Sequence, residues 1–144
     1  MTGLDGAYDP ANIFAKMLRS EMACVKAFED EVALAIMDIF PQTPGHTLVL
    51  PKAPARNFLD FPNEALGPYM QRVQKVALAV RKALEPDGVT IMQFNGAAAG
   101  QTVFHLHFHI LPRWEGVPLK SHAHDKVTDM NVLEAQARRI AAAL

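Results

Sequence analysis

The chain of 144 residues is long enough for one domain that buries about two thirds of the surface of its unfolded chain. Half of the residues are hydrophobic, and 14 basic against 15 acidic residues give a net charge of −1. This near neutrality argues against general electrostatic binding to nucleic acid or to a membrane surface. One cysteine, no signal-peptide pattern and no apolar run of transmembrane length favour a reducing, cytoplasmic setting.

The first half of the chain predicts a short helix followed by three strands. Residues 12–19 form the helix, which Asn12 can cap. Two β-compatible runs, 24–28 and 32–37, are separated by charged residues and predict a hairpin. Residues 45–50 form a third strand after a turn that contains two prolines.

The second half predicts a long helix and two more strands. From Asn63, the expected cap, apolar residues recur every three or four positions up to Leu84, as one buried helix face requires. Residues 89–94 and 103–111 are strand-like, and a loop of small residues joins them at 95–101. The order β-β-β, long helix, β-β indicates an α+β domain, with helices on one face of a five-stranded antiparallel sheet.

The segment after Trp114 is expected to be a loop and then a helix that Asp129 caps. This helix is expected to run through the apolar residues Val132, Leu133, Ala137 and Ile140. His122 and His124 alternate within a polar stretch, which favours a solvated loop.

Three of the six histidines lie within five positions, at 105, 107 and 109. In an extended strand, side chains two residues apart project from one face. The spacing therefore predicts a row of imidazoles on one face, with Phe104, Leu106, Phe108 and Ile110 on the apolar face. That apolar face fixes the register of the strand. Neighbouring Cα atoms in the row would be about 6.6 Å apart, which suits rings that converge on a small anion or a metal ion.

A metal site is an alternative interpretation of this row. Two histidines at i and i+2 on a strand can share one zinc ion when another nitrogen, sulfur or carboxylate completes the ligand set. No acidic residue or cysteine lies close in sequence, and Cys24 alone cannot form a Cys-x-x-Cys pair. Ligands from distant parts of the sequence leave this alternative open.

Residues 105–111 match the pattern His-φ-His-φ-His-φ-φ, where φ is apolar, and here the chain resembles the histidine triad (HIT) superfamily. Residues 38–52, Asp-Ile-Phe-Pro-Gln-Thr-Pro-Gly-His-Thr-Leu-Val-Leu-Pro-Lys, are similar to the second hallmark of that family. Asn95-Gly96 followed by Gly100-Gln101-Thr102 is similar to its phosphate loop. The resemblance covers residues 12–113 and implies a single HIT domain over residues 1–144, with residues 114–144 as a C-terminal extension.

The resemblance implies covalent nucleotidyl chemistry. A neutral imidazole can attack phosphorus and form an intermediate that water later cleaves. By resemblance His107 is the nucleophile, His109 contacts the phosphate and the leaving group, and His105 and His46 set tautomer and position. No cofactor is implied. Many bacterial relatives carry a zinc-binding Cys-x-x-Cys in the first helix, where this chain has Asn12-Ile13-Phe14-Ala15, so no metal is expected.

The resemblance also implies a site for a purine nucleotide. Asp38 is expected to accept hydrogen bonds from the ribose hydroxyls, although the residue by itself is equally compatible with a turn. The small residues at 96–100 let a backbone approach phosphate, although a plain connection between strands has the same composition. The other expected nucleotide contacts are an apolar slot for the base and groups at the phosphate, namely Phe14, Met22, Ile36, Ile39, Asn95, Gly100, Gln101 and Thr102.

The leading hypothesis is a hydrolase of nucleoside phosphoramidates or related AMP-X compounds. The alternatives are a dinucleoside polyphosphate hydrolase, a nucleotidyltransferase, a nucleotide-binding scaffold with residual activity and a metal-binding strand protein. A homodimer is also expected, because an open sheet edge beside a long apolar helix is usually covered. By resemblance, residues 63–84 and 89–94 form the contact.

Overall fold

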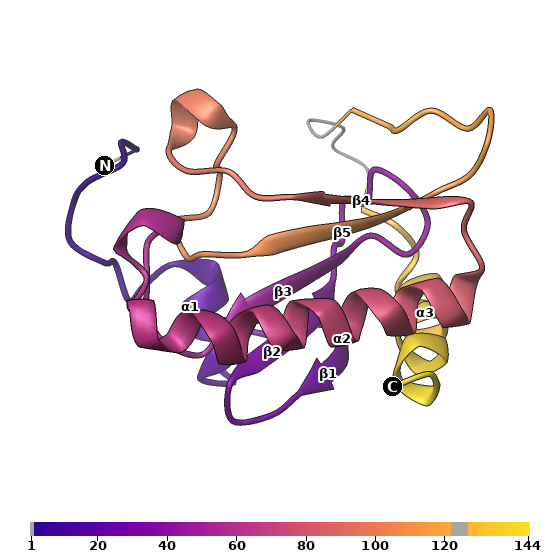
Figure 1. Cartoon of the computed structure of the whole chain (residues 1–144), viewed down its shortest axis with the longest axis horizontal. Coiled ribbons are helices and arrows are strands. Elements are labelled where there is room, and N and C mark those ends of the chain that lie inside the picture. Colours follow the sequence, from indigo (N-terminus) through magenta and orange to yellow (C-terminus); the bar gives the residue numbers. More distant parts are fainter. Residues whose placement is uncertain (1, 122–126) are drawn as a thin grey trace.

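A computed structural model, which describes residues 2–121 and 127–144, contains a five-stranded antiparallel sheet in the order β1-β2-β3-β5-β4 (Figure 1). The strands are β1 (Lys26–Glu29), β2 (Ala33–Met37), β3 (Thr47–Pro51), β4 (Gly88–Met92) and β5 (Phe108–Arg113). The helices are α1 (Ile13–Leu18), α2 (Leu66–Leu84) and α3 (Met130–Ala142), with short 3-10 helices η1 (Phe58–Asp60), η2 (Asn63–Ala65) and η3 (Ala97–Ala99). The predicted α+β class is confirmed. His122 and His124 lie outside the described residues.

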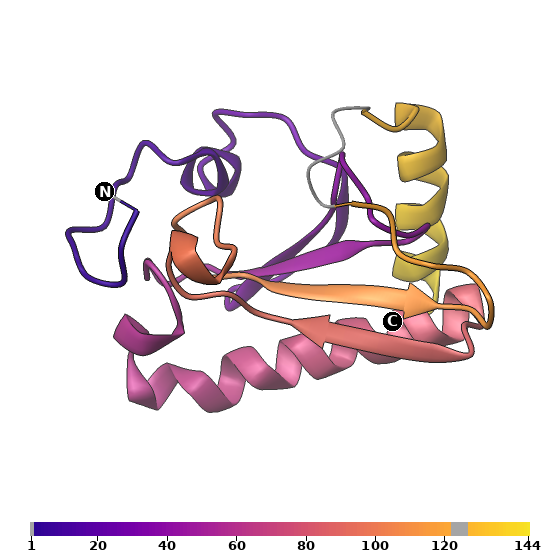
Figure 2. The same ribbon diagram turned by 90° about the horizontal axis from the view of Figure 1, so that it is seen from above.

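Helices cover both faces of the sheet, so the expectation of helices on one face alone is wrong (Figure 2). The face under α2 contains Tyr69, Val76 and Val80 of that helix, packed in one core cluster with alternate residues of β2. The opposite face carries a smaller cluster that Phe14 of α1 closes. Because β2 and β3 are buried on both faces, their residues are apolar except for Thr47, and apolar and polar residues do not alternate along them.

The helix ends follow the predicted caps in two of three cases. Asn12 accepts a hydrogen bond from the Ala15 N–H and Asp129 accepts one from the Asn131 N–H, as their positions predicted. Asn63 does not cap α2, because its 3-10 turn intervenes and Ala65 stands at the N-cap. In the described part of the chain, no helix has the length and apolarity to cross a membrane.

Helix α3 packs against α2, β1 and β2. Leu133, Ala137 and Ile140 are buried in this contact, as the apolar spacing predicted. Val132, also in this helix, is 45% exposed.

Strand β5 starts at Phe108 and not at Val103, so His105 and His107 precede the strand. The pairing of β3 with β5 ends at Val49 opposite Phe108. Pro51, at the end of β3, has no N–H to donate to a continued ladder, and its carbonyl oxygen lies 2.8 Å from Nε2 of His105. The backbone N–H of Leu106 donates instead to Ala55 O, at 2.9 Å.

The apolar alternation nevertheless continues into the segment before β5. Leu106 and Ile110 are fully buried in the cluster under α2, and Phe108 packs against it. Phe104 is only partly buried, with the Arg56 guanidinium 4.6 Å from its ring centroid, so its predicted place on the apolar face is wrong.

The turn before β3 depends on Gly45, which has φ +83°. An added Cβ would lie 2.2 Å from Cδ1 of Leu84, at the C-terminal end of α2. Gly45 thus allows the turn that presents His46 to close tightly over α2.

We expect Gly45→Ala to lower the free energy of unfolding by about 1 to 3 kcal/mol, because the substitution adds both backbone strain and overlap. Gly67→Ala is the matched control, since Gly67 lies in α2 with open space around it and should tolerate or gain from the change. Urea denaturation of both variants measures the difference. Equal stabilities of the two would contradict the role of Gly45.

Candidate active site

His107 has its tautomer set by a backbone carbonyl. Its Nδ1 lies 2.6 Å from the carbonyl oxygen of His105. A carbonyl oxygen only accepts hydrogen bonds, so Nδ1 of His107 carries the proton. In the neutral ring the lone pair then resides on Nε2, which is the atom that can attack an electrophile.

His46 and His109 form a second buried pair with a defined direction of hydrogen bonding. The Gln42 N–H donates to Nδ1 of His46 at 3.1 Å, so the ring proton of neutral His46 is on Nε2. Nε2 of His46 lies 2.9 Å from Nδ1 of His109 and donates to it. Neutral His109 therefore carries its proton on Nε2 and can act as a donor. The rings of His109 and His107 lie 5.0 Å apart between centroids.

Asp38 joins this pair from the turn after β2. One carboxylate oxygen accepts from the Phe40 N–H at 2.8 Å, which is the turn role considered for this residue. The other oxygen lies 3.5 Å from Nε2 of His46. The carboxylate thus favours positive charge on the His46 and His109 pair.

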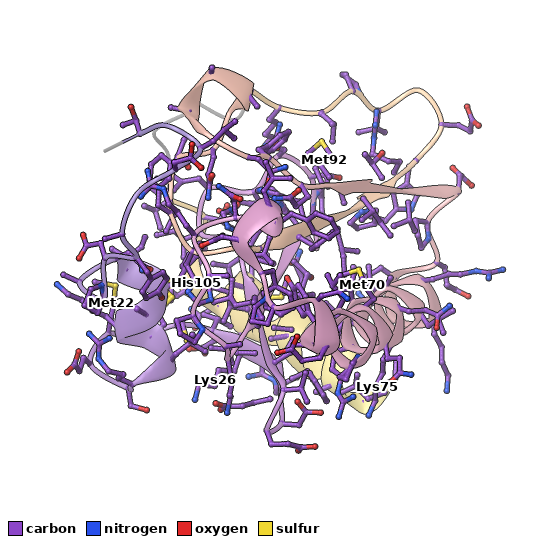
Figure 3. All side chains as sticks on the ribbon, turned by 60° about the vertical axis from the view of Figure 1, so that its left-hand side comes forward. Met22, Lys26, Met70, Lys75, Met92 and His105 are labelled. Atoms are coloured by element: carbon purple, nitrogen blue, oxygen red, sulfur yellow. The ribbon has the colours of Figure 1, made fainter. Side chains whose placement is uncertain are left out.

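His105 faces away from the other imidazoles. Its Nε2 lies 2.8 Å from the Pro51 carbonyl oxygen and its Nδ1 lies 2.5 Å from the Tyr8 hydroxyl. Figure 3 shows the residue beside α1. Burial lowers the pKa of His105, and the bond to Pro51 opposes this only in part. The spacing predicted a single row of three imidazoles, and the structure divides it. The ring of His105 bonds to Pro51 and Tyr8 within the protein, whereas the rings of His107 and His109 line a cavity.

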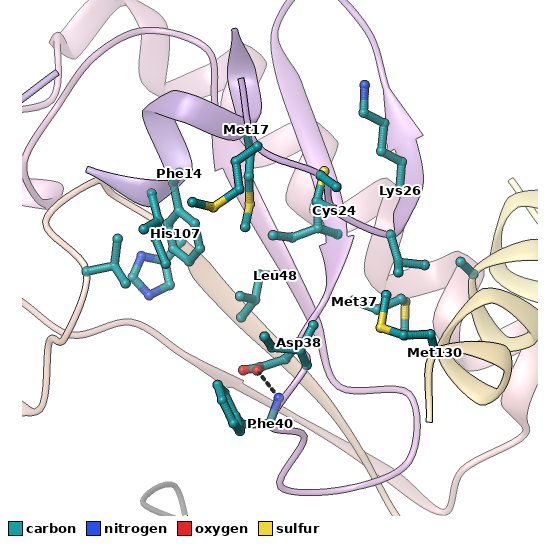
Figure 4. Close-up of a pocket in the computed structure, with 18 of the residues that line it drawn as sticks. Phe14, Met17, Cys24, Lys26, Met37, Asp38, Phe40, Leu48, His107 and Met130 are labelled. Atoms are coloured by element: carbon teal, nitrogen blue, oxygen red, sulfur yellow. Dashed lines mark hydrogen bonds between the residues drawn. The ribbon is translucent and has the colours of Figure 1, made fainter. Parts of the chain in front are cut away.

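A cavity of about 690 Å³ lies over the α1 face of the sheet. His107 and His109 line it, and the nearby wall contains Asp38 with its bond to Phe40 (Figure 4). The four apolar residues expected to hold the base also line it, namely Phe14, Met22, Ile36 and Ile39. The ring of Phe14 stands edge-on to that of His107, with 4.9 Å between centroids. The structure thus brings the predicted base slot and two of the predicted catalytic histidines into one cavity.

The polar groups of the loop at 95–101 are largely engaged in hydrogen bonds within the protein. The Gln101 side chain is buried, accepts from the Gly96 N–H and donates to Arg56 O and Val103 O. The Asn95 side chain accepts from the Phe58 N–H. The loop N–H groups that donate within the protein are those of residues 96, 97, 99, 100 and 101. Among the described residues of the predicted phosphate loop, Thr102 lines the cavity, whereas Asn95, Gly100 and Gln101 do not.

The described residues contain one group of side chains that could together hold a metal ion, formed by Asp38, His46 and His109. Each offers one ligand atom, and the three atoms lie within 4.8 Å of one another. A metal ion there would replace the proton between His46 and His109. The carboxylate comes from a residue 67 positions before the first triad histidine in sequence, which is why the sequence left the ligand set open.

Two parts of the site escape prediction from the sequence. Helix α3 contributes Met130, Glu134 and Arg138 to the cavity wall, at the side away from His107 (Figure 4). Tyr8 contacts His105 from a segment with no recognisable pattern. The periodicity of α3 predicts a helix, but no sequence signal places it beside the cavity.

The fold and this arrangement of histidines agree with the comparison to known proteins. The chain belongs to the HIT domain family, whose model matches residues 19–116. The HIT proteins form a superfamily of nucleotide-binding hydrolases. The resemblance inferred from residues 38–52 and 105–111 is therefore confirmed.

Individual relatives extend this similarity over nearly the whole chain. A solved Hit-like protein from Bartonella henselae, described as involved in cell-cycle regulation, is 52% identical with a TM-score of 0.91. The similarity covers 96% of this chain and 100% of that one. Protein hit of Bacillus subtilis is 40% identical over 90% of this chain and 94% of its own length. Adenylylsulfatase HINT3 of Arabidopsis thaliana is 34% identical over 77% of this chain and 59% of its own length.

The environment of His105 generates a prediction about pH. Its lowered pKa means that the folded chain keeps His105 neutral at a pH where an unfolded chain would bind a proton, about 6.5. His105 should therefore lower the free energy of unfolding as the pH falls below that value. Above that value it should have no effect. An NMR titration of the ring should show a midpoint below that of free histidine. A midpoint at or above the ordinary value would contradict the assignment.

Proposed function

We propose that the protein hydrolyses nucleoside phosphoramidates or related AMP-X compounds through a covalent nucleotidyl intermediate on His107. The observation that carries the proposal is the bond from Nδ1 of His107 to the His105 carbonyl, which leaves the lone pair on Nε2 of a ring that lines the cavity. The cavity is apolar enough for a purine base and has a carboxylate near its histidine end. The name of the Arabidopsis relative supports an AMP-X substrate, since it is an adenylylsulfatase.

In the first step Nε2 of His107 attacks the α-phosphorus, and the bond from phosphorus to the leaving group breaks. The leaving group needs a proton, and the Nε2–H of His109 is the donor we assign. The Nε2–H of His46 donates to Nδ1 of His109 across the 2.9 Å contact, and this hydrogen bond stabilises the negative charge that His109 gains when it gives up its proton. In the second step water attacks phosphorus and returns a proton to Nε2 of His109, the bond from phosphorus to His107 breaks, and the nucleotide leaves. No metal ion or cofactor takes part in these steps.

His107→Ala should lower turnover of a fluorogenic adenosine phosphoramidate by at least about a thousandfold, because covalent catalysis is lost while the cavity remains. Mass spectrometry of the wild-type protein during turnover should detect adenylylated His107. Calorimetric titration with AMP is the control and should show retained binding by the variant. Activity within tenfold of the wild type would contradict the assignment of the nucleophile.

Asp38 is assigned to the ribose hydroxyls by its place in the cavity wall and by its family position. Asp38→Ala should raise KM for ribonucleotides. It should also reduce the difference in KM between ribonucleotides and their 2′-deoxy analogues. The loss of one charge-assisted hydrogen bond corresponds to an increase in KM of about tenfold to a hundredfold. Asp38→Asn is the matched variant, since it keeps an oxygen for the Phe40 N–H and separates the turn from ribose binding. An unchanged ribose preference in Asp38→Ala would show that Asp38 serves only the turn.

We also propose a homodimer formed through α2 and the edge strand β4. Val89 and Ile91 of β4 and Leu78 of α2 are apolar and exposed in the single chain, with exposed fractions of 37%, 51% and 55%. Exposed apolar residues on an edge strand are usually covered in proteins that remain unaggregated. A second copy related by a twofold axis is the simplest cover.

Sedimentation at micromolar concentration should give twice the chain mass of 15.8 kDa. Ile91→Glu should shift the protein toward the monomer, because a buried unpaired charge is costly. Val132→Glu is the control, since Val132 is similarly exposed but lies on α3, outside the proposed interface of α2 and β4. A monomeric wild type, or equal effects of both variants, would contradict this interface.

A further inference from the structure

The N-terminal segment before α1 crosses the molecule close to the histidines. Arg56 donates through Nη2 to the Gly3 carbonyl at 3.0 Å, and Asn57 donates through Nδ2 to the Leu4 carbonyl at 2.9 Å. The Ala97 N–H in the small-residue loop donates to the Thr2 carbonyl at 2.8 Å. These bonds fix the segment against both the loop at 95–101 and the residues after β3. The same segment places the Tyr8 hydroxyl beside the ring of His105.

The bond between Tyr8 and His105 has one direction. Nε2 of His105 must donate, because its partner is the Pro51 carbonyl oxygen. In the neutral ring Nδ1 is then an acceptor, and the Tyr8 hydroxyl is the donor at 2.5 Å. Burial lowers the pKa of His105 and raises the pKa of Tyr8, so both shifts favour this arrangement of protons.

This bond matters because the segment around His105 lies outside the sheet. The ladder between β3 and β5 ends at Phe108, so it does not hold the His105 backbone. The contacts that hold this stretch include the ring of His105, between Pro51 and Tyr8, the bond from the Leu106 N–H to Ala55 O and the burial of the Leu106 side chain in the core. The His105 carbonyl, in turn, is the acceptor that orients His107.

We propose that Tyr8 is a positioning residue, whose hydroxyl holds the ring of His105 so that the His105 carbonyl keeps His107 in the tautomer with its lone pair on Nε2. Tyr8 acts through His105 and does not touch the substrate. The kinetic consequence rests on the proposed function of His107. The consequence for the tautomer of His107 does not depend on that function.

The test is Tyr8→Phe, which removes the hydroxyl and keeps the ring that stands edge-on to His105. We expect kcat for the adenosine phosphoramidate to fall about tenfold, the effect of losing one hydrogen bond, while KM changes less than about twofold. In the protein without substrate, nitrogen NMR of the histidine rings should show His107 almost entirely as the Nδ1–H form in the wild type. The variant should show a measurable share of the Nε2–H form.

Tyr69→Phe is the matched control. Tyr69 is the other tyrosine of the chain, and its buried hydroxyl donates to the Val49 carbonyl at 2.7 Å. Removing it should lower the thermal stability without changing the ring nitrogen signals of His107. The two variants therefore separate a general loss of stability from a specific loss of orientation.

An identical His107 nitrogen pattern in Tyr8→Phe and the wild type overturns the proposal, whatever happens to kcat. An unchanged kcat overturns it as well, provided that the wild type turns over. If the wild type does not hydrolyse the substrate, the proposed function fails and the NMR comparison still decides the role of Tyr8. Should Tyr8→Phe fold poorly, the wild type supplies a second measurement. Its Tyr8 hydroxyl proton should exchange slowly and show a contact to His105, and a rapidly exchanging proton overturns the proposal.

Discussion

One hydrogen bond between a ring and a backbone carbonyl decides the chemistry available to His107. With the proton on Nδ1, the lone pair is on Nε2, at a ring that lines the cavity, and with the opposite tautomer it would point to the His105 carbonyl. The carbonyl of His105 can accept this bond because its segment has left the sheet, where it would have paired with a neighbouring strand. The ladder of β5 with β3 ends at Phe108 and the ladder with β4 ends at His109, so both stop before His105. Pro51, which would oppose Leu106, has no N–H with which to extend the ladder of β3. The point at which strand pairing ends therefore bears on the protonation of His107.

Apolar residues and histidines alternate along residues 105–110. The apolar side chains pack into the core under α2, and His107 and His109 line the cavity on the opposite face. Leu106 and Ile110 are fully buried under α2, and each contributes about 2 to 3 kcal/mol of transfer free energy to the position of the segment. His107 and His109 lie on the other face, where α1, the residues before β1 and the residues after β2 leave a cavity. Packing on one face thus fixes the geometry on the other, and the imidazoles need not contribute to the hydrophobic core.

The features that depend on local pattern could be predicted from the sequence. The periodicity of residues 66–84, the caps at Asn12 and Asp129 and the hairpin of β1 and β2 each follow from neighbouring residues. The residues predicted to hold a base and the central histidine line one cavity, and motifs of fixed spacing made it possible to name them. Three features could not, because each depends on tertiary contacts. They are the end of the β3–β5 ladder at Val49 and Phe108, the hydrogen bonds of the Gln101 side chain, and the approach of Tyr8 to His105. An alternating strand pattern is equally compatible with six residues of ladder and with nine, so it cannot say where pairing stops.

The low exposure of His107, at 7%, has a consequence for the fate of any group bound to it. A covalent intermediate at this ring would be reached by water only through the open part of the cavity, next to apolar side chains that attract water poorly. Its lifetime would then depend on how often an acceptor enters, and an alcohol or amine that fits the cavity would compete with water. In such a site hydrolysis and group transfer are two outcomes of one intermediate, and the shape of the entrance sets their ratio.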